Sequence, residues 1–80
     1  MENLTLEERL IELGYQIRKI RIRRNMDQVM LAQRAGIGLS ALKNLEGGHG
    51  ATLTTFIKTL RALGRADWLD TLAPTVSMTC

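Results

Sequence analysis

The sequence predicts an all-α domain organised around a helix-turn-helix. Apolar residues recur at intervals of three and four in several short segments, which is the spacing of one helix face. Two of these segments, 28–35 and 39–46, are joined by a turn that contains Gly36 and Ile37. Two helices of about two turns each, with a glycine between them, are typical of a helix-turn-helix. Each is too short to be stable alone, so we expect further helices to pack around the pair.

A long first helix is expected from Leu6 to Arg24. It begins at a capping box, in which Thr5 is followed three residues later by Glu8. Asn25 tolerates the left-handed backbone conformation and is expected to end the helix. Gly14 lies within the apolar pattern, where it lowers helix stability by about 1 kcal/mol relative to alanine. Either another helix packs closely at this glycine or the helix breaks there.

Two more helices are expected after the helix-turn-helix. Thr52 is a candidate N-cap for a fourth helix that ends at Gly64, and a short fifth helix spans about 66–72 before Pro74. Residues 1–74 then form one domain, followed by a C-terminal tail, 75–80. Polar and apolar residues alternate in this tail, which favours a short strand. An unpaired chain end is the alternative.

Composition excludes several functional classes. The single cysteine, Cys80, has no partner for an internal disulfide or a metal site, which suits a reducing cytosol. No apolar run approaches the length of a membrane span. No catalytic pair of carboxylates and no phosphate-cradling glycine loop is present. We therefore expect a cytoplasmic protein that is not an enzyme and has no cofactor or metal.

The segment from Leu13 to Gly48 reads LGYQIRKIRIRRNMDQVMLAQRAGIGLSALKNLEGG. It resembles the phage repressor/Cro-like, or Xre-type, helix-turn-helix family, and the resemblance covers about 13–74. It implies a five-helix lambda-repressor-like domain that binds double-stranded DNA. The segment from Leu53 to Pro74 is similar to HipB-type antitoxins within that family.

The resemblance also implies which residues contact DNA. In the family, the glutamine at the start of the second helix contacts phosphate or base, and the polar face of the third helix enters the major groove. Lysine donates to guanine, asparagine pairs with adenine, and an apolar side chain meets a thymine methyl group. His49 follows in a loop, near phosphate or simply solvated. The candidate DNA-contacting residues are Gln28, Leu39, Ser40, Lys43, Asn44 and His49.

Charged residues of the first helix divide into two expected roles. The resemblance pairs Arg21 with Glu46, which would tie the first helix to the third as a structural ion pair. The block from Arg18 to Arg24 holds five basic residues and no acidic residue. These basic side chains could reach the DNA backbone, although most charge runs of this kind are solvated helix faces.

Departures from the family pattern leave two functions open. Gly38 replaces the usual serine or threonine cap, and apolar Val29 and Met30 replace a pair that is often acidic. The first function is a dimeric, sequence-specific transcriptional repressor. The alternative is an antitoxin that binds and neutralises a partner toxin protein and autoregulates its operon.

Apolar residues near the C-terminus predict a homodimer. The short fifth helix carries more apolar surface than it can bury, and the tail continues with strand-like alternation. In a twofold dimer the fifth helix and tail of a second copy would cover the same two segments of the first copy. Two recognition helices would then read an inverted-repeat operator. The candidate interface residues are Trp68, Leu69, Leu72, Val76 and Met78.

Overall fold

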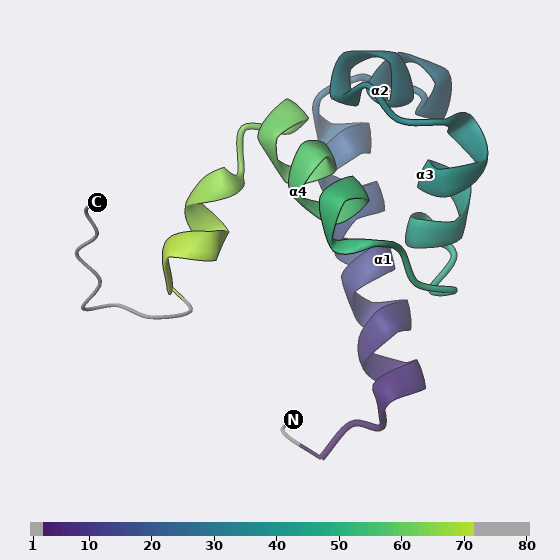
Figure 1. Ribbon diagram of the computed structural model, residues 1–80, viewed down its shortest axis with the longest axis vertical. Coiled ribbons are helices and arrows are strands. Elements are labelled where there is room, and N and C mark those ends of the chain that lie inside the picture. Colours follow the sequence, from purple (N-terminus) through teal and green to yellow (C-terminus); the bar gives the residue numbers. More distant parts are fainter. Residues whose placement is uncertain (1–2, 72–80) are drawn as a thin grey trace.

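The computed structural model describes residues 3–71, and this part of the chain is entirely helical (Figure 1). Its elements are α1 (Leu6–Arg23), α2 (Gln28–Ala35), α3 (Leu39–Glu46), α4 (Leu53–Ala62) and the 3₁₀ helix η1 (Ala66–Thr71). The predicted all-α class and the order of the five helices are confirmed. Four features predicted from the sequence lie outside the described residues: the tail strand, Leu72, Val76 and Met78.

Both ends of α1 follow the predicted capping chemistry, and α2 begins at an aspartate cap. The Thr5 and Glu8 side chains each accept a backbone N–H of the other residue, at 3.1 and 2.9 Å, so the capping box is complete. The helix ends at Arg23, one residue earlier than predicted, and Asn25 takes a left-handed conformation (φ 58°) just after the C-cap Arg24. The Asp27 carboxylate accepts the N–H of Met30 at 2.8 Å and thereby begins α2.

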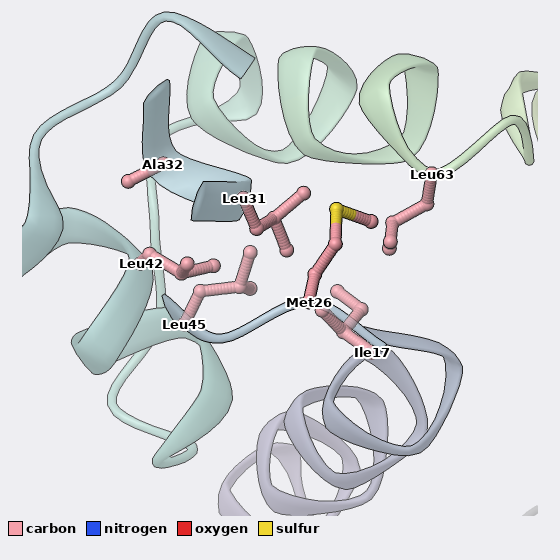
Figure 2. Packing of buried hydrophobic residues seen from close by; sticks show 7 residues of the cluster. All are labelled: Ile17, Met26, Leu31, Ala32, Leu42, Leu45 and Leu63. Atoms are coloured by element: carbon pink, nitrogen blue, oxygen red, sulfur yellow. The ribbon is translucent and has the colours of Figure 1, made fainter. Parts of the chain in front are cut away.

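One apolar core joins α1 to α4 (Figure 2). Leu31 of α2 lies in the middle of this core, with Leu42 of α3 on one side and Ile17 of α1 and Leu63 at the end of α4 on the other. All four side chains are fully buried. Burying a leucine or isoleucine side chain contributes about 1.5–3 kcal/mol, so this cluster supplies the packing that two-turn helices cannot supply themselves.

Leu6 and Leu53 belong to the apolar pattern of their helices but are largely exposed. Leu6 is 72% exposed and Leu53 is 71% exposed. Each is the first residue of its helix. Figure 1 shows that the N-terminal half of α1 projects beyond α3, so the apolar face of α1 continues past its helical partners. Apolar periodicity therefore extends further along the chain than the packing does.

Gly14 marks a close approach between α1 and the C-terminal end of α3. A Cβ atom at this position would lie 2.6 Å from the carbonyl oxygen of Glu46 and would also collide with that of Leu45. The glycine is therefore present because α3 packs against it, and the helix does not break there. Gly48, just after α3, approaches Ile11 in the same way, because its Cβ would lie 2.7 Å from the Ile11 Cγ1 atom.

The fifth helix is a 3₁₀ helix of six residues rather than an α-helix. Short segments favour the tighter 3₁₀ hydrogen-bonding pattern because few α-helical bonds can be completed in them. Trp68 and Leu69 are half-buried in it.

Substitution of Gly14 by alanine tests the close packing of α1 on α3. We expect Gly14→Ala to lower the free energy of unfolding by about 1–3 kcal/mol, because the added methyl group meets backbone atoms rather than a flexible side chain. Urea denaturation followed by circular dichroism measures the change. Gly38→Ser is the control, since no described atom lies within 4 Å of its Cβ position, and it should change stability by only a few tenths of a kcal/mol. A Gly14→Ala protein as stable as the parent would contradict the packing.

Candidate nucleic-acid interface

The turn between α2 and α3 fixes the angle of the two helices. Gly36 takes a left-handed conformation (φ 72°), which a residue with a side chain rarely adopts. The next N–H, that of Ile37, donates to the carbonyl oxygen of Ala32 at 3.0 Å, which closes the helix end. The Ile37 side chain is partly buried and packs against the core. The orientation of α3 is therefore set by the backbone and by burial together.

The eight residues of α3 divide into a buried face and an exposed face. Leu42 and Leu45 are buried in the core. Ser40, Lys43 and Asn44 are exposed, and at about 100° per residue they share one arc of roughly 100° on the opposite side of the helix. This face presents a hydroxyl, an ammonium and an amide group, all of which are hydrogen-bond donors to base edges.

The first turn of α3 differs from the rest of that face. Leu39 is half-buried and packs against the core, so only part of its side chain is accessible to a DNA methyl group. Gly38 is the N-cap and has no side chain to accept a backbone N–H. Some N–H groups at the start of the helix therefore remain available to a solvent molecule or an external acceptor.

A buried ion pair joins α1 to the C-terminal end of α3. Arg21 donates from Nε and Nη2 to the two carboxylate oxygens of Glu46, at 2.7 and 3.0 Å. The side chains of the pair are only 10% and 4% exposed. Arg21 also donates from Nη1 to the carbonyl oxygen of Met26 at 2.9 Å. This bidentate geometry is the strong form of a carboxylate–guanidinium contact.

Gln28, at the start of α2, completes the network. Its Nε2 donates to Glu46 Oε1 at 3.1 Å, so the carboxylate receives hydrogen bonds from two helices. The amide NH₂ group carries a second proton, which is available to an acceptor such as a phosphate oxygen. The ion pair therefore holds Gln28 in place beside the exposed face of α3.

An open hollow of about 250 Å³ lies over this network, and we call it the ion-pair hollow. Arg18 and Lys43 stand on its wall, and both side chains are exposed. The sequence analysis did not distinguish Arg18 from the other basic residues of α1. The feature that could have identified it is its position one helical turn before Arg21, which puts both arginines on one side of α1. The lining residues are Arg18, Arg21, Gln28, Lys43, Glu46 and Gly47.

His49 lies in the loop after α3 and not on the helix face. His49 is exposed, and its backbone N–H donates to the carbonyl oxygen of Asn44 at 2.9 Å. Within residues 3–71 no group of three metal-ligating side chains gathers, and no helix of this part is long and apolar enough to cross a membrane.

A comparison with protein-family models matches residues 17–69 to a helix-turn-helix family whose members include Xre-type and lambda-repressor-like proteins. The chain belongs to this family. The matched region contains α2, α3, α4, the ion-pair partners and most of η1. At the level of the family, the protein is a DNA-binding transcription regulator, a class that is generally not enzymatic. A comparison with curated proteins gives no match.

A double-mutant cycle tests the strength of the Arg21–Glu46 pair. We expect Arg21→Met or Glu46→Gln alone to lower stability by about 3–5 kcal/mol, because each leaves the partner charge buried and unpaired. The double variant should recover part of that loss, since neither charge is then stranded. Chemical denaturation of all four proteins measures the coupling.

The exposed pair of Arg9 and Glu12 is the matched control, because both side chains are more than 40% exposed. Its removal should cost at most about 1 kcal/mol. Strictly additive losses in the Arg21–Glu46 cycle would show that the two side chains do not depend on one another.

Proposed function

We propose that the protein is a sequence-specific repressor that binds double-stranded DNA as a homodimer. The observation that carries the proposal is the exposed face of α3, where Ser40, Lys43 and Asn44 stand together beside the ion-pair hollow. A two-turn helix with donors on one face and leucines on the other fits the major groove while staying attached to its core.

The two sets of residues have different roles in this proposal. Lys43 and Asn44 read base edges, because their donor groups match guanine and adenine respectively. Arg18 and Gln28 hold the phosphate backbone and set the register of α3 in the groove, without selecting a sequence. Ser40 lies on the same face, one turn earlier. A protein that occupies an operator in this way excludes other proteins from it, which is sufficient for repression.

The dimer rests on the apolar residues after α4. Trp68 and Leu69 of η1 remain half-exposed in the single chain. A second copy, related by a twofold axis, would cover them and would place the two α3 helices about 34 Å apart, one turn of DNA. The operator is then an inverted repeat with this spacing between half-sites.

The alternative function is that of an antitoxin with a partner toxin protein. Val29 is 50% exposed and Met30 is 38% exposed, both on α2. Neighbouring apolar side chains on a surface helix favour a protein contact rather than a phosphate contact. In this alternative DNA binding serves autoregulation. Selection from random DNA that enriches no motif, together with a partner that copurifies from the native host, would favour it over the specific repressor.

Substitutions on α3 test the base-reading role. We expect Lys43→Ala and Asn44→Ala each to lose about 1–3 kcal/mol of discrimination at one operator position, because the donor that recognises that base is removed. Selection from random DNA followed by fluorescence anisotropy with the enriched site measures this. Affinity should fall steeply with salt in every case, because phosphate contacts release counterions. Lys58→Ala, which removes an exposed positive charge from α4, should leave the preference for DNA bases unchanged.

Analytical ultracentrifugation tests the dimer. We expect a chain truncated after Pro74, and a full chain with Trp68→Ala and Leu72→Ala, both to sediment as monomers, because each loses apolar surface that needs a partner. Leu53→Ala, at the other end of α4, is the control and should remain dimeric. If the truncated chain alone stays dimeric, the tail strand is not part of the interface. If both stay dimeric, the interface lies elsewhere.

A further inference from the structure

A second charged hollow lies at the C-terminal end of α4, and we call it the arginine hollow. It is open, has a volume of about 790 Å³, and is formed by the residue that follows α1, the end of α4 and the start of η1. None of its lining residues belongs to α2 or α3, so it is separate from the ion-pair hollow. The lining residues are Arg24, Arg61, Gly64, Arg65, Ala66 and Asp67.

Three arginines line the arginine hollow, and little opposing charge faces them. Among the described residues, neither Arg24 nor Arg61 has an ion-pair partner. Arg65 is 3.9 Å from the Asp67 carboxylate, which is 73% exposed and therefore only a weak partner. Like charges gathered in this way repel each other, so an anion in the hollow would relieve an existing cost.

Two of the three arginines have local contacts that position them. Arg65 stacks on the indole ring of Trp68, with its guanidinium carbon 5.2 Å from the ring centroid. Arg24 extends over Gly64, where a Cβ atom would lie 3.5 Å from its Nη2. Gly64 has a left-handed backbone (φ 72°) and no side chain, so the floor of the hollow stays open beneath Arg24.

The geometry points to a phosphate-binding site in the arginine hollow, held by Arg24, Arg61 and Arg65. The planar guanidinium group presents paired N–H donors that match two oxygens of one phosphate, and several such groups together favour a multiply charged anion. The phosphate comes either from a free phosphorylated small molecule or from the DNA backbone beyond the contact of α3. The first source needs no DNA, so it is independent of the proposed function.

Titration with inorganic pyrophosphate tests the free source. We expect saturable binding by calorimetry, with the largest amide shifts in NMR spectra at Gly64 and its neighbours. Arg24→Gln and Arg61→Gln should each weaken binding at least about tenfold, because each removes a hydrogen bond to a charged group. Arg61→Lys keeps the charge without the paired donors and should fall between the parent and Arg61→Gln. Thermal melting confirms that each variant is folded.

The matched control is Lys58→Gln, which removes the same charge from the same helix but from outside the hollow. It should leave pyrophosphate affinity within about twofold of the parent, since Lys58 does not line the arginine hollow and donates no hydrogen bond to an anion bound there. If Lys58→Gln weakens binding as much as Arg61→Gln, the attraction is general and the site does not exist.

The DNA source is tested on a mixed-sequence duplex by measuring affinity against salt concentration. If backbone phosphate enters the hollow, the Arg24→Gln, Arg61→Gln double variant should reduce the slope of log affinity on log salt by about 1 for each phosphate that it no longer binds, and Lys58→Gln should not. Pyrophosphate binding with an unchanged slope assigns the site to a free anion. The proposal is overturned if pyrophosphate does not bind and the slope does not change. A protein that binds pyrophosphate but no DNA would contradict the proposed function alone.

Discussion

The buried pair of Arg21 and Glu46 is the interaction on which the rest of the structure depends. Burying two charges is costly, and the cost is offset only when the geometry is good and the remaining donors and acceptors are satisfied. Here both carboxylate oxygens accept from Arg21, and the third guanidinium nitrogen donates to Met26. No buried side-chain polar atom between residues 3 and 71 lacks a partner. The same pair also fixes Gln28, so one contact joins α1, the loop before α2, α2 itself and α3.

The sequence predicted the helices and their ends well because those signals are local. A threonine cap, an asparagine after the last turn and a glycine between two helices each act within a few residues of where they stand. The distant contacts were less accessible. The pairing of Arg21 with Glu46, 25 residues apart, was expected only through the family resemblance. The exposed positions of Leu6 and Leu53 were missed because periodicity identifies a helix face but not the length over which a partner covers it.

Only the part of the candidate interface that depends on local helix geometry was predicted. Helical spacing is enough to place Ser40, Lys43 and Asn44 on one face. It does not show that Arg18 shares a hollow with Lys43, because that depends on the crossing of α1 and α3. The arginine hollow also depends on a contact between distant parts of the chain. Arg61 and Arg65 lie on either side of Gly64 in the sequence, but only the folded chain brings Arg24 to them. A modest net charge of +3 therefore conceals two concentrated basic regions.

The division of α3 into two faces has a consequence for how this protein diverges. Leu42 and Leu45 carry the packing, while Ser40, Lys43 and Asn44 make no core contact. Changes at the exposed three positions are therefore nearly free of stability effects, as surface changes usually are. Under the proposed function, duplicated copies of the gene would acquire different binding preferences one substitution at a time, with each intermediate remaining folded. A helix that used the same residues for packing and for recognition would not have this freedom.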